Sequence, residues 1–261
     1  MRPLWVLGAP STEMDAVEAV LVAQDAAVAY AAGHDTARVS LDNRSRAGFV
    51  LLSGTEPVPF PAVYAAGGRM RLVDCDFVGP RPLGGATVHY VGHHLSWGAP
   101  GYGLPAEQYW EASAIGQVSA AFGVDPTPRL RVVAAAAHCL TEAYHGRCPG
   151  VDPDVLLAHR LSVLASAWGV SLAQAFAAIV LARDLLALAP RALSDGMGFA
   201  DLRSLTLGPD TLRALPEASQ RDGVPYLLAS PYAVDSPLRP RRAPASALGT
   251  VLTLQARAFA S

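Results

Sequence analysis

Polar side chains that can bind metal ions follow three apolar segments of the N-terminal half, each at the point where the segment ends. Ser11, Glu13 and Asp15 follow residues 4–7, Asp74 and Asp76 follow residues 71–73, and His93 and His94 follow residues 86–91. In an open α/β sheet, ligands bind outside the carboxyl ends of the strands. If these segments are parallel strands, we therefore expect the polar side chains to converge on one site.

Carboxylates and imidazoles together are typical ligands of a divalent metal. Carboxylate oxygens suit Mg²⁺ and Mn²⁺, and imidazole nitrogens shift the preference toward Mn²⁺, Fe²⁺ or Zn²⁺. We therefore predict a divalent metal, with Mn²⁺ as the first candidate, bound by Asp74 and His93, and with Asp76 and Asp15 as further candidate ligands. An aspartate after a strand can instead be a helix cap or turn former, and this alternative stays open for Asp74 and Asp76.

Two helical segments of the same half could bring further groups to this site. His138 lies in an apolar, alanine-rich stretch, residues 132–140, where it is either a structural core histidine or a metal ligand. Ser113 lies among small residues at 111–114, where we expect a helix to begin with its amino end facing the site. Helix amino ends attract anions, which makes Ser113 a candidate substrate contact; alternatively, the small residues only permit close helix packing.

The composition restricts the chemistry of the chain and its partners. All 20 basic residues are arginine, which excludes mechanisms that need a Schiff-base or P-loop lysine. Arginines are therefore expected to bind the phosphate of a substrate, and Arg44, Arg46 and Arg81 are the candidates. The net charge of −2 argues against general nucleic-acid binding. The three cysteines form no C-x-x-C pair, so we expect reduced thiols and no zinc ribbon.

Alternating strand and helix signals predict an α/β fold with a mainly parallel sheet flanked by helices. We expect strands at 4–7, 71–73 and 86–91, extended pieces at 49–52 and 62–64, and helices at 14–31, 107–122 and 130–144. A change of composition near residue 150 predicts three parts. These are an α/β domain over 1–150, a helical connector over 151–195 and a smaller C-terminal α+β domain over 196–261.

The apolar segments are too short or too interrupted to cross a membrane. No uninterrupted apolar run reaches the ~18 residues that a membrane-spanning helix needs. The N-terminal residues lead directly into a predicted strand and lack the pattern of a signal peptide. We therefore expect a cytoplasmic protein without membrane contact, and a homodimer is left open.

The order of these features resembles the DHH phosphoesterase superfamily over residues 4–150. That superfamily includes exonucleases, small-nucleotide phosphatases, cyclic-dinucleotide phosphodiesterases and pyrophosphatases. Its second, third and fourth motifs are matched here by Val73-Asp74, Gly92-His93-His94 and Ala137-His138. The resemblance implies a metal-dependent phosphoesterase, and members of the superfamily usually hold two Mn²⁺ ions.

The departures from the superfamily pattern imply an altered metal site. The first motif, usually H-x-x-P-D-x-D, keeps its proline and the acidic Glu13, or Asp15 if the loop shifts by two residues. The third motif has Gly92 in place of aspartate, and His138 stands where the fourth has aspartate. We therefore expect a single-metal site built from Asp74, His93 and His138 with Glu13. The C-terminal part lacks the G-G-G-H segment that often binds substrate in the superfamily.

The metal site and the resemblance together predict a divalent-metal-dependent phosphoesterase. Its substrate would be a small phosphate-bearing molecule, with a nucleotide as the first candidate, attacked by metal-activated water. His94 or Glu13 would orient that water or relay a proton. The altered first motif supports an alternative, a non-catalytic or repurposed relative that binds a nucleotide or a metal. Metal-dependent hydrolysis of a different bond also stays open, because a fold does not determine chemistry.

Overall fold

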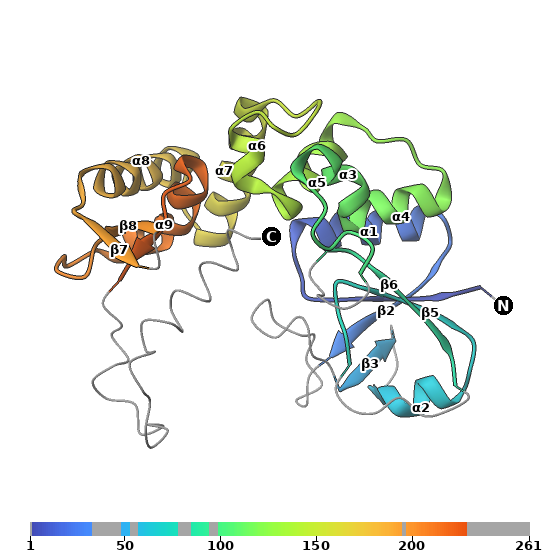
Figure 1. Cartoon of the computed structure of the whole chain (residues 1–261). Coiled ribbons are helices and arrows are strands. Elements are labelled where there is room, and N and C mark those ends of the chain that lie inside the picture. Colours follow the sequence, from blue (N-terminus) through green and yellow to red (C-terminus); the bar gives the residue numbers. More distant parts are fainter. Residues whose placement is uncertain are drawn as a thin grey trace, which may run out of the picture. The chain divides into compact units, whose positions relative to one another are not determined.

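The computed structural model describes residues 2–32, 48–52, 57–77, 85–93, 99–194 and 197–228. The chain forms two compact units, and each is described by itself (Figure 1). The first unit contains residues 1–139 and 146–152, and the second contains residues 140–145 and 153–261. The chain therefore passes between the units after residue 139, after residue 145 and after residue 152.

The first unit is built on a six-stranded sheet with the strand order β4-β3-β2-β1-β5-β6. Its strands are β1 (Leu4–Leu7), β2 (Ala27–Ala32), β3 (Phe49–Leu52), β4 (Val58–Pro59), β5 (Arg69–Val73) and β6 (Thr87–Val91). β2, β1, β5 and β6 run parallel, whereas the pairs β2-β3 and β3-β4 are antiparallel. The prediction of an α/β fold with a mainly parallel sheet flanked by helices is confirmed.

Helices cover both faces of this sheet (Figure 1). One face carries α1 (Thr12–Ala23), α4 (Ala114–Phe122), α5 (Pro128–His138), the short α3 (Tyr109–Ala112) and the 3₁₀ turn Ala106–Gln108, and the other carries α2 (Phe60–Ala65). Successive side chains of a strand point to opposite faces, so β1 serves both layers. Trp5 packs on Phe122 of α4 with ring centroids 5.5 Å apart, whereas Val6 joins the core on the α2 side.

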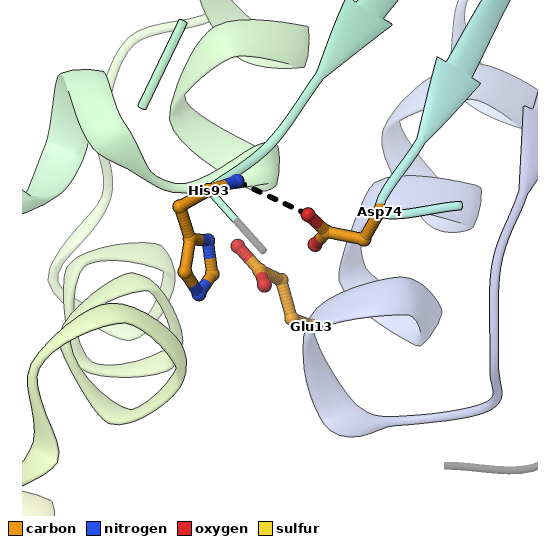
Figure 2. A group of neighbouring side chains, drawn as sticks. All are labelled: Glu13, Asp74 and His93. Carbon is orange, nitrogen blue, oxygen red and sulfur yellow. Dashed lines mark hydrogen bonds between the residues drawn. The ribbon is translucent and has the colours of Figure 1, made fainter. Parts of the chain in front are cut away.

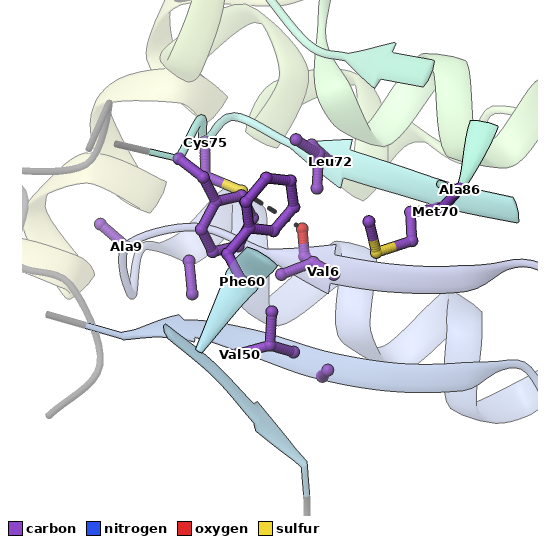
Figure 3. Close-up of a cluster of buried hydrophobic side chains, with 11 residues drawn as sticks. Val6, Ala9, Val50, Phe60, Met70, Leu72, Cys75 and Ala86 are labelled. Atoms are coloured by element: carbon purple, nitrogen blue, oxygen red, sulfur yellow. Dashed lines mark hydrogen bonds between the residues drawn. The ribbon is translucent and has the colours of Figure 1, made fainter. Parts of the chain in front are cut away.

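The core on the α2 side is a cluster of buried apolar side chains (Figure 3). Val6, Met70 and Leu72 from the central strands belong to the same buried cluster as Phe60, the first residue of α2. The Phe60 ring stacks on Phe77 with centroids 3.9 Å apart and an interplanar angle of 3°. This packing holds β1 and β5 side by side, and it thereby sets the positions of the loops that follow them.

The order of the strands places a topological switch point between β1 and β5. From β1 the chain continues through α1 to β2 on one side, and it later returns through α2 to β5 on the other side. The helices α1 and α2 lie on opposite faces of the sheet (Figure 1). The loops after two such strands diverge, and the crevice outside their carboxyl ends is where α/β sheets bind ligands.

Over the residues that the structure describes, the second unit combines four helices with a small sheet. In chain order it contains α6 (Leu140–Tyr144), α7 (Pro153–Trp168), α8 (Leu172–Leu188), β7 (Arg191–Ser194), β8 (Met197–Asp201), α9 (Pro209–Asp222) and β9 (Tyr226–Leu227). The sheet has the order β7-β8-β9. Ile179 and Leu186 of α8 share a core with Leu215 of α9, and Leu161 of α7 packs against it. The helices expected as a connector over 151–195 are therefore part of the core of this unit.

Two local predictions were wrong. The helix expected at 14–31 ends at Ala23, and Ala27–Ala32 is strand β2. Asp25 has a φ of 50°, a left-handed conformation that ends the helix, and the alanine-rich pattern after it suits a strand as well as a helix. The extended piece expected at 62–64 lies within α2, which begins next to Pro59 and Pro61. Proline is well tolerated in the first turn of a helix.

The helices expected at 107–122 and 130–144 are each interrupted by one residue. Ser113 has extended geometry (φ −68°, ψ 151°) and separates α3 from α4. Cys139 has φ −147° and ψ 55° and separates α5 from α6. Hydrophobic periodicity continues across both interruptions, so the pattern alone does not reveal them.

Among the described residues, no single helix is long and apolar enough to cross a membrane. Taken together, α7 and α8 have the length and composition of a membrane-spanning segment, but the two helices are bent by 105° relative to each other.

Candidate metal centre

Glu13, Asp74 and His93 converge at the switch point (Figure 2). Each offers one ligand atom, and these atoms all lie within 4.8 Å of one another. Glu13 lies in the first turn of α1, Asp74 directly follows β5, and His93 follows β6 after Gly92. The three residues are only 3%, 6% and 3% exposed, so the group is buried. Three segments that are far apart in the sequence therefore supply one site.

Positive φ angles at Asp74 and Gly92 allow these side chains to converge. Asp74 has a φ of 45°, and its Oδ1 accepts a hydrogen bond of 3.1 Å from the His93 N–H (Figure 2). Gly92 has a φ of 118°, and a Cβ atom added there would lie 1.8 Å from Asp74 Oδ1. Only glycine therefore fits at position 92 while Asp74 keeps this position.

Glu13 is oriented by two helix amino ends. Ser11 caps α1 by accepting a hydrogen bond from the Met14 N–H at 3.1 Å, which places Glu13 in the first turn. Glu13 Oε1 accepts a hydrogen bond of 3.2 Å from the Ile115 N–H in the first turn of α4. Carboxylates are favoured at helix amino ends, so Glu13 occupies a position that suits an acidic side chain.

Ser113 is used to build this amino end. Its hydroxyl oxygen accepts a hydrogen bond from the Gly116 N–H at 3.1 Å and donates one to the Trp110 carbonyl oxygen at 3.0 Å. The side chain is fully buried and caps α4. The amino end of α4 faces Glu13, as expected for the segment 111–114. The Ser113 hydroxyl, which was a candidate substrate contact, makes its two hydrogen bonds within the chain and positions the helix.

His138 lies directly beside this group. Its ring meets the His93 ring edge to face, with centroids 5.1 Å apart and an interplanar angle of 85°. Nε2 of His138 lies 2.9 Å from the Leu104 carbonyl oxygen, and Nε2 of His93 lies 3.1 Å from the Ala137 carbonyl oxygen. A carbonyl only accepts, so Nε2 carries the proton in both rings.

This tautomer leaves the other nitrogen of His138 with a lone pair. Burial, together with the nearby His93, lowers the pKa of His138, so the ring is neutral near pH 7. His138 is 5% exposed, and its Nδ1 has no hydrogen-bond partner among the residues that the structure describes. A buried polar atom of this kind favours a ligand, because leaving it unpaired costs free energy. His138 therefore has the chemistry of an additional ligand.

Two predicted ligands lie outside this group. Asp76 Oδ1 accepts hydrogen bonds from the Phe77 N–H at 2.8 Å and the Tyr90 hydroxyl at 3.0 Å, as a turn-forming aspartate does. Asp15 is exposed on α1, two residues beyond Glu13, and faces away from the buried side of that helix. The helical register thus selects Glu13, not Asp15, as the acid of the first loop. His94, Arg44, Arg46 and Arg81 lie outside the described residues.

Gln117 is a site residue that the sequence analysis missed. Its Oε1 accepts a hydrogen bond from the Gly92 N–H at 2.9 Å. Its Nε2 donates to the carbonyl oxygens of Gly92 at 3.3 Å and Ala112 at 2.8 Å. One side chain thereby fixes the backbone that carries His93. A single amide in the otherwise apolar segment 114–118 was the only sequence signal for it.

The donor set fits a divalent metal. It combines two carboxylates with one imidazole and a second imidazole adjacent, which suits Mn²⁺, Fe²⁺ or Zn²⁺. Two carboxylates buried this close repel each other, and a shared cation favours the ionised form of both. Comparisons of the chain with protein-family models, curated proteins and solved structures found no match, so the resemblance to the DHH superfamily stays a prediction.

Proposed function

We propose that this chain is a divalent-metal-dependent phosphoesterase that acts on a small phosphate-bearing substrate, with a nucleotide as the first candidate. The observation that carries the proposal is the buried convergence of Glu13, Asp74 and His93 at the switch point of the sheet. His138, with a lone pair beside this group, extends the donor set. We further propose that the protein works in the cytoplasm.

Each residue of the group has a distinct role in the proposal. Glu13, Asp74 and His93 would hold one divalent ion, with Mn²⁺ as the first candidate and His138 as a further ligand. When bound, such an ion supplies charge neutralisation at a phosphoryl group and activation of water near neutral pH. The amino end of α4 and Gln117 hold Glu13 and the His93 backbone in place. Binding of this kind depends on positions that are set before the ligand arrives.

Titration of chelator-stripped protein with Mn²⁺ tests the metal site. We expect one equivalent to bind, and we expect Asp74→Asn and Glu13→Gln to abolish binding because each removes a charged ligand. The matched control is Asp15→Asn, which removes an exposed carboxylate from the same helix as Glu13 and should leave binding unchanged. Two equivalents would instead indicate the two-metal arrangement of the DHH superfamily. Equal loss in the Asp15 variant would show that general charge, not the site, controls binding.

Hydrolysis assays with nucleotides, short oligonucleotides and pyrophosphate test the catalytic part. His93→Ala should abolish Mn²⁺-dependent turnover, a loss larger than the ~10²–10⁴-fold of a missing general acid or base. His94→Ala should cost less, ~10–100-fold, if it acts by supporting a ligand. If the protein binds Mn²⁺ but turns over none of these substrates, the non-catalytic binding protein replaces the phosphoesterase.

A further inference from the structure

We propose that Cys139 and Cys148 form a reversible intramolecular disulfide, a covalent modification site. The two Sγ atoms lie 2.9 Å apart, and the cysteines are nine residues apart in the sequence. A disulfide requires an S–S distance of about 2.05 Å. The two sulfur atoms therefore need to approach by only ~0.9 Å for a bond to form.

The two thiols are held together by well-anchored backbone. Cys139 directly follows α5, and its N–H donates to the Ala135 carbonyl oxygen at 3.0 Å. Cys148 begins a turn in which its carbonyl oxygen accepts from the Val151 N–H at 3.2 Å. The next carbonyl, of Pro149, accepts a hydrogen bond of 3.0 Å from the hydroxyl of the buried Tyr109. The short distance between the sulfur atoms is therefore set by two segments, the end of α5 and the turn at Cys148, each of which has its own hydrogen bonds.

The position of the pair in the chain gives the bond a structural effect. Both cysteines belong to the first unit, whereas residues 140–145 between them, which contain α6, belong to the second. A disulfide would therefore link, within the first unit, the two ends of the segment that contains α6. Closing a loop in this way stabilises a fold chiefly by restricting the unfolded chain.

The reaction is an exchange with a small-molecule disulfide such as oxidised glutathione. Cys139, 7% exposed against 1% for Cys148, attacks one sulfur of that disulfide, breaks its S–S bond and releases one thiol. Cys148 then attacks the Cys139 sulfur of the mixed disulfide and releases the second thiol. The two cysteines are oxidised, the small disulfide is reduced to two thiols, and these take up the two protons.

Cys75 provides an internal control. It is fully buried in the core of the sheet, where its Sγ lies 3.5 Å from the Val6 carbonyl oxygen. Its complete burial keeps dissolved disulfides away from its thiol. Cys75 should therefore stay reduced under conditions that oxidise the other two cysteines.

Peptide mapping without reduction tests the proposal on the wild-type chain. Trypsin cleaves after Arg131, Arg147 and Arg160, so Cys139 and Cys148 fall in separate peptides, 132–147 and 148–160. After treatment with oxidised glutathione and alkylation in denaturant, we expect these peptides to be linked, with the mass of both minus two hydrogen atoms. Dithiothreitol should separate them. Recovery of both as alkylated or glutathionylated single peptides, or a link to Cys75, would overturn the proposal.

Two variants and a melting curve complete the test. Cys75→Ala should still form the link, and Cys148→Ser should not. The oxidised wild type should melt at a higher temperature than the reduced form, and the same treatment should not raise the melting temperature of Cys148→Ser. A lower melting temperature of the oxidised wild type would show that the bond does not fit the native fold, which also contradicts the proposal.

Discussion

At the scale of single residues, Gly92 decides how the candidate metal centre can be built. Its missing Cβ leaves the space that Asp74 Oδ1 occupies, and its φ of 118° turns the chain so that His93 enters the site. If the predicted resemblance to the DHH superfamily holds, the matching position in that superfamily is an aspartate. In this chain Asp74 Oδ1 occupies that space, so a side chain at position 92 would clash with it.

We therefore expect that Gly92→Asp, which introduces the aspartate of the DHH motif, weakens Mn²⁺ binding instead of improving it. The new side chain would displace Asp74, and its backbone would be strained by ~1–3 kcal/mol. Mn²⁺ titration and thermal melting measure the two effects. Gly67→Asp is the matched control, because Gly67 also has a positive φ, 78°, but a Cβ there would meet nothing within 4 Å. Stronger Mn²⁺ binding by Gly92→Asp would contradict the role given to this glycine.

The role of His138 can be tested separately from those of Glu13, Asp74 and His93. His138→Gln keeps an amide that can donate to the Leu104 carbonyl oxygen, but it removes the imidazole lone pair. We expect Mn²⁺ affinity to fall ~10–100-fold, as is typical when a supporting group of a metal site is lost. The loss should be smaller than that of His93→Ala in the same titration. An unchanged Mn²⁺ affinity would show that His138 has only a structural role.

At the scale of helices, a buried ion pair joins three elements of the second unit. Glu217 of α9 is 3% exposed and accepts hydrogen bonds from Arg160 of α7, with Arg160 Nη2 to Glu217 Oε2 at 2.5 Å. Glu217 also accepts a hydrogen bond from the hydroxyl of Tyr144 in α6. Burial alone would lower the pKa of Arg160, but its bond with Glu217 raises the pKa above its usual value. The contacts of Arg160 and Tyr144 therefore both depend on the Glu217 carboxylate.

We expect Glu217→Gln to destabilise the protein strongly. It leaves the Arg160 charge without its counterion, and breaking a buried pair typically costs ~3–5 kcal/mol. The Arg160 side chain is 21% exposed, so a value near the lower end is expected. Urea unfolding measures the change. The matched control is Asp201→Asn, which breaks the exposed pair with Arg203 in the same unit and should change the free energy of unfolding little. Equal effects of the two substitutions would contradict this ranking.

At the scale of the whole molecule, the candidate metal centre draws its ligands from one unit only. Glu13, Asp74 and His93 all belong to the first unit, and so do α4 and α5. An ion bound there would cross-link α1, the end of β5 and the end of β6. A ligand that binds the folded state stabilises the structure that forms its site.

Hydrogen exchange can show whether this stabilisation stays within the first unit. We expect Mn²⁺ to slow exchange of the amide of Asp74, which donates to the Val91 carbonyl oxygen, and of Ile115, which donates to Glu13. Amides in α8 and α9 should be unaffected. Glu13→Gln serves as the control and should abolish the effect. Protection by Mn²⁺ in α8 and α9 but not around Asp74 would place the metal in the second unit.

Much of the fold and part of the site follow from local pattern. Short apolar runs that end in polar residues identified β1, β5 and β6, because a buried strand must be apolar and its end meets solvent or ligand. The same pattern predicted that Asp74 and His93 lie at the ends of strands. Parallel strands bring their carboxyl ends to one edge, so the convergence of these residues could be anticipated without coordinates.

Other features depend on contacts between segments far apart in the chain. Helical register decides that Glu13 enters the site while Asp15 faces outward, and the Tyr90 hydroxyl engages Asp76. The amide of Gln117 fixes Gly92, and the fit of Gly92 depends on Asp74. The approach of Cys139 to Cys148 requires α5 and the turn at residue 148 to be anchored separately. Local sequence sets which groups are available, whereas distances of a few ångströms between them arise only when the sheet, the helices and the loops pack together.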